Sequence, residues 1–197
     1  MNAEMINYIF RHMPEIATER LILRKMRVDD VEDMYDYAKR DELTKYLLWY
    51  SHESKKHTKD YLKYITKKYR AGEFFDWAIE EKESGRMIGT CGFTSIDPTH
   101  RTGEIGYVIN PDFKGRGYAP EAARAIVEFG FYELELNRIE ARFMKGNDPS
   151  LRVMQKIGMI FEGYLRDYMF VKGEYKTVGV CSILKREFSH SIKLTDN

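Results

Sequence analysis

The stretch EIGYVINPDFKGRGYAPEA, residues 104–122, contains the signals that decide the fold. Its first half carries apolar β-branched residues such as Ile105 and Val108 in an alternating pattern, which predicts a strand. Its end opens a run with apolar residues at helical spacing, and a proline suits the first turn of that helix. Between strand and helix, Gly115 and Gly117 let the backbone approach a ligand closely, next to the free N–H groups of the helix start. The stretch therefore predicts an anion site that suits a phosphate or a pyrophosphate.

Two common phosphate-binding motifs do not fit this turn. A Walker A loop ends in Gly-Lys-Ser/Thr, whereas this loop ends in Gly-Tyr-Ala. A dinucleotide fingerprint needs a third Gly or Ala where Pro120 stands, and its acidic partner would be Glu140, which lies inside an alternating strand pattern. A turn that only joins the strand to the helix stays an open alternative, because short glycine-rich motifs often match by chance.

Several segments in a fixed order point to one family. The loop KGRGYA spans residues 114–119, and it is accompanied by TERLILR (18–24), GEIGY (103–107), NDPS (147–150) and KIGM (156–159). Together they resemble the superfamily of GCN5-related N-acetyltransferases (GNAT), whose coenzyme A loop reads Gln/Arg-x-x-Gly-x-Gly/Ala. The loop matches at Gly117 and Ala119, while Lys114 replaces the usual Gln or Arg. The match runs from about residue 14 to residue 188 and is similar to the branch that acetylates N-termini of ribosomal proteins.

The resemblance implies an α+β GNAT fold. This is a central mixed, mostly antiparallel sheet of six to seven strands flanked by about four helices, with a splayed central strand pair that holds acetyl-CoA. We expect an N-terminal extension over residues 1–13 (a short helix or an arm), a single N-acetyltransferase domain over residues 14–188, and a C-terminal tail over residues 189–197. Besides the strand that begins at residue 104, the patterns predict strands over residues 20–26, 76–81, 87–96, 138–145, 159–168 and 175–184, and helices over residues 31–40, 54–71, 120–134 and 148–157.

Composition limits the class of protein. A chain of 197 residues with 43% hydrophobic and 32% charged residues suits one globular domain. The net charge of +1 gives no overall electrostatic footprint for nucleic acid. We therefore expect no nucleic-acid partner and, in the absence of a signal-peptide shape or a long apolar run, no membrane association. Cys91 and Cys181 form no disulfide or metal pattern, so we expect a cytoplasmic protein without a metal.

Two further segments lie before the central strand. The helix over residues 31–40 is expected to bury Val31, Met34, Tyr35 and Ala38 on one face. The aromatic segment over residues 43–54 has two interpretations, core packing or a wall of the acceptor groove. The resemblance favours the second, because the segment between the first two helices usually lines that groove.

The resemblance implies a set of coenzyme contacts. The pantetheine arm pairs with the central strand, a bulge at Gly106 is expected, and an N–H group of Val108 or a neighbour polarises the thioester carbonyl. Asn147 hydrogen-bonds the pantetheine or caps the following helix, and Lys156 reaches the adenosine end or is only a cation at the end of that helix. The cofactor-binding residues are Tyr107, Val108, Ile109, Lys114, Gly115, Arg116, Gly117, Tyr118, Ala119, Asn147 and Lys156.

The resemblance also implies the catalytic residues. Glu104 is the candidate base for the amine, with a solvated carboxylate at a strand end as the alternative. Many relatives have a Tyr that protonates the leaving thiolate, but Met154 stands at that position and cannot donate a proton. Ser150 is the nearest replacement, with Tyr164 and Tyr168 as weaker candidates.

These features predict an acetyltransferase that moves the acetyl group of acetyl-CoA to a primary amine by direct attack in a ternary complex. The N-terminal α-amine of a protein is the first expectation for the acceptor. The alternatives are a small amine, such as a polyamine, an aminoglycoside or an amino acid, and a non-catalytic acyl-CoA-binding module. The resemblance alone also implies a homodimer.

Overall fold

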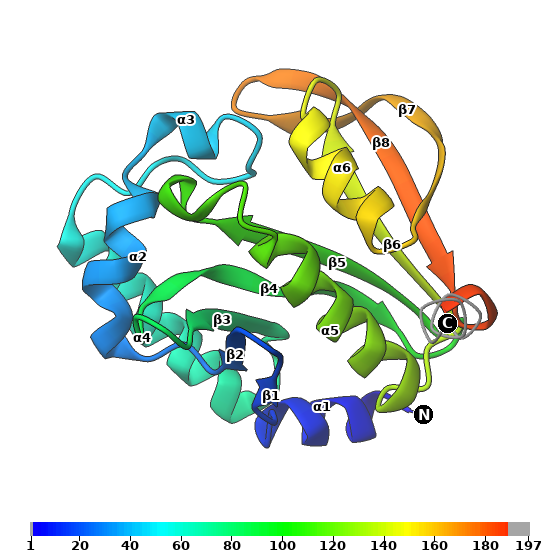
Figure 1. Ribbon diagram of the computed structural model, residues 1–197, viewed down its shortest axis with the longest axis horizontal. Coiled ribbons are helices and arrows are strands. Elements are labelled where there is room, and N and C mark those ends of the chain that lie inside the picture. The colour runs from blue at the N-terminus through cyan, green and yellow to red at the C-terminus, as the bar shows by residue number, and fades with distance from the viewer. Residues whose placement is uncertain (1, 189–197) are drawn as a thin grey trace.

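The computed structural model describes residues 2–188 and is built on an eight-stranded sheet (Figure 1). The strand order is β1-β2-β3-β4-β5-β6-β8-β7, and of these neighbours only β5 and β6 run parallel. The strands are β1 (Ile16–Ala17), β2 (Leu21–Arg24), β3 (Asp76–Glu81), β4 (Met87–Asp97), β5 (Thr102–Ile109), β6 (Arg138–Met144), β7 (Ile160–Val171) and β8 (Glu174–Leu184). The mixed, mostly antiparallel GNAT sheet is confirmed, with the two-residue β1 beyond the six to seven strands expected.

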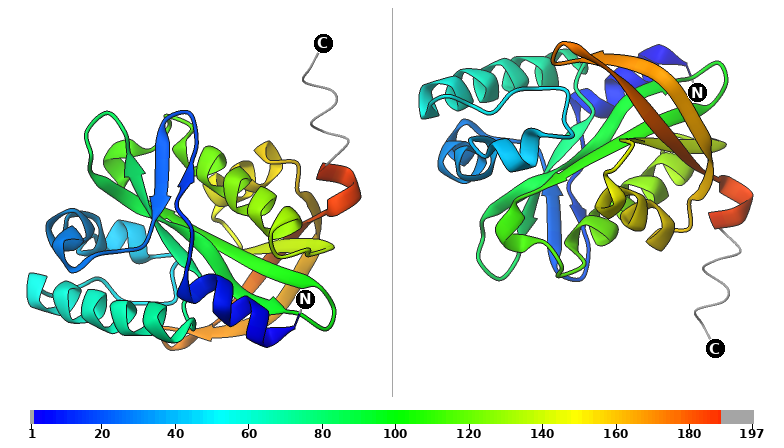
Figure 2. Two further views of the ribbon diagram at one scale, coloured as in Figure 1. Left: turned by 90° about the horizontal axis from the view of Figure 1, so that it is seen from below. Right: turned by 90° about the horizontal axis from the view of Figure 1, so that it is seen from above.

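Helices cover both faces of this sheet (Figure 2). The helix α5 and the helix α6 lie on one face, and α2 and α4 lie on the other. The bounds are α1 (Ala3–Arg11), α2 (Val31–Ala38), α3 (Asp41–Thr44), α4 (Lys55–Ala71), α5 (Tyr118–Tyr132) and α6 (Asp148–Lys156), with short 3-10 turns η1 (Val28–Asp30) and η2 (Pro111–Phe113). The four expected helices are α2, α4, α5 and α6. The helix α1 is one of the two alternatives for residues 1–13, and only the one-turn α3 is an addition.

The first residues form a helix rather than a loose arm. Asn2 caps α1 by accepting a hydrogen bond from the Met5 N–H at 2.9 Å. Phe10 is fully buried and lies 4.5 Å from the Phe75 ring and 5.6 Å from the Trp77 ring, centroid to centroid. The helix α1 therefore packs on the core of the sheet. The tail expected over residues 189–197 lies outside the described residues.

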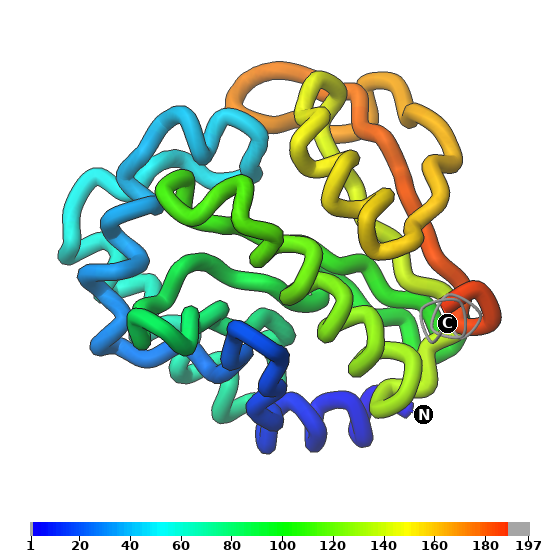
Figure 3. The backbone as a smooth tube through the Cα atoms, viewed as in Figure 1, coloured from blue at the N-terminus to red at the C-terminus, as the bar shows by residue number. Residues whose placement is uncertain are grey.

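The central strands separate part of the way along their length. The parallel pairing of β5 with β6 ends at Ile105 and Ala141, although β5 continues to Ile109. The expected splayed pair is confirmed, and Figure 3 shows the two chain paths diverging. The splay leaves one side of β5 without a strand partner, next to the glycine turn that begins α5.

Two local expectations are corrected. Gly106 is not a bulge: it pairs in register with Gly92, and the irregularity lies on β4 at Thr94. Thr94 folds over β5, since its Oγ1 donates to the Glu104 carbonyl and its methyl group would lie 3.1 Å from a Cβ at residue 106. On α2, Tyr37 rather than Tyr35 is buried with Met34 and Ala38, because the buried face is turned slightly from the predicted one.

Within residues 2–188 the structure contains no helix long and apolar enough to cross a membrane.

Candidate active site

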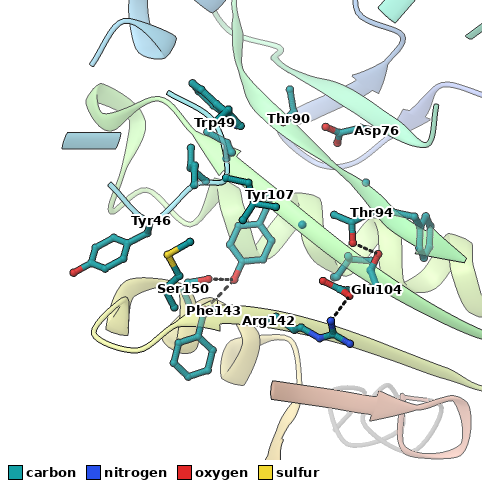
Figure 4. A pocket seen from close by; sticks show the side chains of 18 of the residues that line it. Tyr46, Trp49, Asp76, Thr90, Thr94, Glu104, Tyr107, Arg142, Phe143 and Ser150 are labelled. Carbon is teal, nitrogen blue, oxygen red and sulfur yellow. Dashed lines mark hydrogen bonds and ion pairs between the residues drawn. The ribbon is translucent and has the colours of Figure 1, made fainter. Parts of the chain in front are cut away.

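A cavity of about 790 Å³ lies where β5 and β6 separate (Figure 4). Its walls come from β4, β5, the end of β6, the start of α6 and the aromatic segment after α3. That segment lines the cavity through Tyr46, Leu47, Leu48, Trp49 and Tyr50. The segment therefore lines a cavity, as the groove-wall interpretation requires, and Trp49 also packs against the core. Leu48 and Tyr50 are 63% and 68% exposed at the rim.

The two sheet faces divide the cavity into two sides. Side chains alternate along β5, so Glu104 and Gly106 point to the face that carries α2 and α4. Tyr107 points to the opposite face, where its hydroxyl reaches α6. A ligand threaded through the splay can thus be approached from two sides, by α6 and Tyr107 on one and by Glu104 on the other.

The splay exposes backbone N–H groups of β5. Asn110 N–H donates to the Ile88 carbonyl at 2.8 Å, and N–H directions alternate along a strand. The Val108 N–H therefore also points to β4, whereas Tyr107 and Ile109 direct theirs to the side from which β6 has diverged. Of the N–H groups named from sequence, those of Tyr107 and Ile109 suit a carbonyl in the opening better than that of Val108.

The glycine turn presents a row of backbone N–H groups, from residue 115 to residue 119, that make no hydrogen bond within residues 2–188. Gly115 and Gly117 have φ angles of 79° and 83°, in the left-handed region that glycine adopts at little cost. Lys114 and Arg116 are exposed beside them, and Ala119 lies in the first turn of α5. Successive free N–H groups at a helix start fit the pyrophosphate of coenzyme A.

A network that sequence reasoning missed fastens this turn to β2. The Arg20 guanidinium donates to the Arg116 carbonyl at 2.8 Å and to Glu121 Oε2 at 2.8 Å, and it lies 4.7 Å above the Tyr118 ring. Thr18 Oγ1 donates to the other Glu121 oxygen at 2.6 Å. Tyr118 is buried and donates through its hydroxyl to Glu81, so only its backbone is available to a ligand. The 18–24 segment was noticed as a motif, but nothing in it indicated this contact.

Glu104 stands at the edge of the opening. Its Oε2 lies 3.4 Å from Arg142 Nη1, and Arg142 also pairs with Glu140 at 2.7 Å. Burial raises the pKa of Glu104 above its ordinary value, and the positive charge of Arg142 opposes that shift. A carboxylate with a raised pKa at the mouth of a cavity is a reasonable proton acceptor.

Ser150 and Tyr107 meet on the other side. The Tyr107 hydroxyl donates to the Ser150 carbonyl at 2.9 Å and lies 3.0 Å from Ser150 Oγ (Figure 4). Met154 is 1% exposed and lines the same cavity, so no hydroxyl comes from its position on α6. A tyrosine hydroxyl is therefore present in this region, but it comes from β5 and was named from sequence only for its backbone.

The two remaining candidates for coenzyme contacts, Asn147 and Lys156, differ in their distance from the cavity. Asn147 is the N-cap residue of α6 by position, yet its side chain makes no capping hydrogen bond and lines the cavity. No hydrogen bond among the described residues occupies that amide, so it is available to a ligand. Lys156 lies exposed in the last turn of α6, away from the cavity lining.

No cluster of metal-ligating side chains occurs within residues 2–188. Cys91 and Cys181 are buried and free.

A strand pair that opens beside a glycine turn with free N–H groups is an arrangement that suits coenzyme A, and the comparisons identify the class of enzyme. The family model described as acetyltransferase (GNAT) domain matches residues 20–160. The chain is 36% identical to an uncharacterized N-acetyltransferase, p20, of Bacillus licheniformis over 90% of this chain and 99% of that protein. It superposes on a GNAT-family acetyltransferase of Bacillus anthracis with a TM-score of 0.78 and 32% identity, covering 88% of this chain and all of the other. The chain belongs to the GNAT family and is an acetyl-CoA-dependent N-acetyltransferase.

Relatives within the family differ in the acceptor that their names give. A putative ribosomal N-acetyltransferase of Bacillus subtilis, YdaF, is 36% identical over 53% of this chain and 57% of its own length. A spermidine N(1)-acetyltransferase of Escherichia coli K12 is 27% identical over 53% of this chain and 56% of its own. Family membership therefore fixes the reaction and leaves the acceptor to be inferred from the cavity.

Proposed function

We propose that the acceptor is the N-terminal α-amine of a protein, acetylated by direct attack within a ternary complex. The observation that carries this proposal is the rim of the cavity, where Leu48 and Tyr50 are more than half exposed. Exposed apolar side chains at the mouth of a pocket suit contact with a partner chain. The named activity of the ribosomal relative supports the same choice.

In this proposal Glu104 takes the proton that the amine loses. It lies on the face opposite Tyr107, so the amine enters from the side of α2 and α4. An α-amine with a pKa of about 8 is partly neutral at pH 7 and places a modest demand on a base. The Arg142 ion pair keeps the Glu104 side chain at the edge of the opening.

Acetyl-CoA supplies the acetyl group as a thioester. The C–N bond forms as the C–S bond breaks, and the sulfur receives a proton from the opposite side of the sheet. Ser150 Oγ is the proposed donor, and the Tyr107 hydroxyl at 3.0 Å can replace the proton that Oγ loses when the phenol turns its O–H from the Ser150 carbonyl to Oγ. In this proposal the pair takes over the role of the tyrosine that is expected at the position of Met154.

The coenzyme contacts are proposed in two groups. The N–H groups from Gly115 to Ala119 bind the pyrophosphate, with Lys114 and Arg116 adding positive charge. The β5 backbone at Tyr107 and Ile109, flanked by Val108, pairs with the pantetheine arm, and the Asn147 amide contributes a hydrogen bond. Lys156 remains a candidate for the adenosine end.

A small amine is the second candidate, favoured by the carboxyl group of Asp76 at the inner end of the cavity. An aromatic cavity that contains a carboxylate suits a cationic ligand, as the spermidine relative illustrates by name. A cytoplasmic location also remains a proposal, supported by the two free cysteines.

The homodimer is likewise a proposal, supported by the hairpin of β7 and β8. The edge strand β7 exposes Leu165, Tyr168 and Phe170, and β8 exposes Tyr175. Such a surface is typical of association. Sedimentation of the full chain tests it, and a monomer at all concentrations would contradict it.

The first experiment is a thiol-release assay with acetyl-CoA and a panel of acceptors. Peptides that begin with Ala or Ser should be acetylated at the α-amine, as mass spectrometry would verify. Turnover restricted to small amines would select the second candidate. Gly117→Val should abolish coenzyme binding, because it loses the left-handed turn and its Cβ would stand 3.3 Å from Arg20 Nη2. Undiminished binding would disprove the loop assignment.

A further inference from the structure

A row of residues across the sheet joins the opening to a carboxyl group. Gly106 on β5 pairs with Gly92 on β4, and Gly92 pairs with Asp76 at the start of β3. Residues paired across strands share a face, so Asp76 lies on the same face as Glu104. Two strand spacings separate Asp76 from β5 by about 10 Å. The glycines between them contribute no side chains, which leaves the floor of the cavity flat along this row.

Two polar groups at the far end of this row have no partner. Among the hydrogen bonds of residues 2–188, none involves the buried Oδ1 of Asp76 or the hydroxyl of Tyr37. Tyr37 is 1% exposed, on α2, and both residues line the cavity. The Asp76 Oδ1 lies over Gly92, 2.9 Å from where a Cβ would stand. Buried polar groups without partners are uncommon in proteins, and here a pair faces one cavity.

The charged side chains that line the cavity form ion pairs with residues other than Asp76. Arg142 pairs with Glu104 and Glu140, and the cavity-lining Glu73 is paired with Lys68 at 2.6 Å. Burial, followed by the charge of His57, lowers the pKa of His52 to about 4, so His52 is neutral at pH 7. Within the described residues, no ion pair compensates Asp76.

The titratable groups that face Asp76 from α2 and α4 are neutral phenols. Burial raises the pKa of Tyr37 on α2 and of Tyr61 and Tyr69 on α4, and the charge of Asp76 raises each of them further. Burial raises the pKa of Asp76 itself to about 7. A buried carboxyl group without a cation, among aromatic rings, matches the chemistry of an ammonium site.

We propose that Asp76 and Tyr37 form a subsite that binds a second ammonium group of the acceptor, while the reacting amine lies beside Glu104. The Asp76 carboxylate accepts hydrogen bonds from the ammonium group, and the Tyr37 hydroxyl accepts another. The second ammonium comes either from a small diamine or from a basic side chain close to the N-terminus of a peptide. This inference rests on the proposed acetyl transfer and specifies that the acceptor carries a second ammonium group.

The test compares acceptors that differ only in the second charge. One arm compares 1,5-diaminopentane with n-pentylamine, and the other compares a peptide beginning Ala-Lys with one beginning Ala-norleucine. In at least one arm the charged acceptor should have a kcat/KM higher by about tenfold or more, the usual effect of a hydrogen bond to a charged group. Asp76→Asn should reduce this ratio to near one, and Tyr37→Phe should reduce it partly. The arm that shows the preference identifies the source of the ammonium.

Glu73→Gln is the matched control, since that carboxylate lines the same cavity but already has Lys68 as partner. It should keep the preference for the second charge. Equal rates for charged and uncharged acceptors in both arms would overturn the subsite while leaving the acetyl transfer intact. A preference that survives Asp76→Asn would also overturn it.

A binding measurement keeps the inference testable without turnover. In the presence of coenzyme A, 1,5-diaminopentane or the Ala-Lys peptide should raise the Tm of the wild type and not that of Asp76→Asn. If no acceptor reacts but this shift appears, the proposed function fails and the subsite stands. Tyr37→Phe should keep the wild-type Tm without ligand, because its hydroxyl makes no hydrogen bond within the described chain. Absence of any ligand-induced shift in the wild type would overturn the subsite.

Discussion

The hydroxyl of Tyr107 on β5 lies 3.0 Å from Ser150 Oγ at the start of α6 and also donates to the Ser150 carbonyl. The contact joins β5 to α6, the helix on which Met154 stands at the position where the resemblance implies a tyrosine. Burial raises the pKa of Tyr107, so the phenol keeps its proton at neutral pH. The pair can therefore deliver a proton to a thiolate although α6 has Met154 in place of a tyrosine.

Tyr107→Phe should lower kcat by about a hundredfold, the lower end of the range expected for a group in proton transfer, with a smaller change in the KM for acetyl-CoA. Initial rates of thiol release measure this effect. Tyr164→Phe on β7 is the matched control and should retain the wild-type kcat, because Tyr164, a weaker candidate from the sequence, is 47% exposed and does not line the cavity. If Tyr107→Phe is as active as the wild type, the phenol has no part in proton transfer.

Ser150→Ala and the double variant test whether the two hydroxyls act as one unit. If Tyr107 works through Ser150, the second substitution should add little to the first, a strong departure from additivity. Independent, multiplying losses would show instead that the two residues act separately. Equal Tm values across the set would rule out a loss of folding as the cause.

Glu104→Gln should lower kcat/KM most at pH values where Glu104 is ionised but the acceptor amine still carries the proton that a base must remove. Burial raises the pKa of Glu104, so the carboxylate of the wild type is lost at a higher pH than that of an ordinary glutamate. In the wild type, kcat/KM should therefore fall as Glu104 is protonated, and the pH profile of the variant should lack this fall. A profile that is merely displaced downward at all pH values would remove Glu104 from the role of base.

Arg20→Ala should weaken coenzyme A binding by about tenfold. The substitution removes the hydrogen bond to the Arg116 carbonyl and leaves the Glu121 charge uncompensated close to the N–H groups of the glycine turn. Calorimetric titration with coenzyme A measures the change, which should shrink at high salt. Arg27→Ala, which removes only an exposed ion pair to Glu15, is the control. Equal affinities for both variants would show that Arg20 does not position the turn.

Local signals in the sequence were enough to predict the strand, the glycine turn and the helix around the site. The alternation in β5, the glycines of the turn and the apolar spacing of α5 are properties of neighbouring residues, and the structure has these elements as expected. The contact between Arg20 and Glu121 spans 101 positions, and that between Tyr107 and Ser150 spans 43. Such pairs depend on strand order and on the register of pairing, which one sequence does not specify.

The errors have a similar origin. Gly106 was expected to form a bulge because glycine is common there, but the extra residue lies on β4, and its position depends on the partner strand. Tyr37 was overlooked because rotating a short helix by one residue changes which tyrosine is buried. Both errors concern the acceptor side, where packing between distant elements decides the geometry.

Asp76→Asn should make the fold more stable at pH 8 and have little effect at pH 4. Burial raises the pKa of Asp76 from 3.8 to about 7, so the folded protein holds this proton more tightly than the unfolded chain. The unfolded chain loses it as the pH rises above 4, so the wild type loses stability from about pH 4 to about pH 7, where the folded carboxyl also ionises. The asparagine variant does not titrate, and its advantage should grow over this window to about 4 kcal/mol, since each of the roughly 3 pKa units is worth about 1.4 kcal/mol.

Urea denaturation at a series of pH values measures this difference between Asp76→Asn and the wild type. Asp60→Asn is the control, because Asp60 is exposed on α4 and its pKa is lowered by Lys56, so no such window is expected. A pH-independent difference for Asp76→Asn would mean that the Asp76 carboxyl is ionised in the folded protein throughout this range. A cation or water would then already stabilise it. Because a bound ammonium group would lower the pKa of Asp76, adding 1,5-diaminopentane should restore most of the stability of the wild type at pH 8 and leave the variant unchanged.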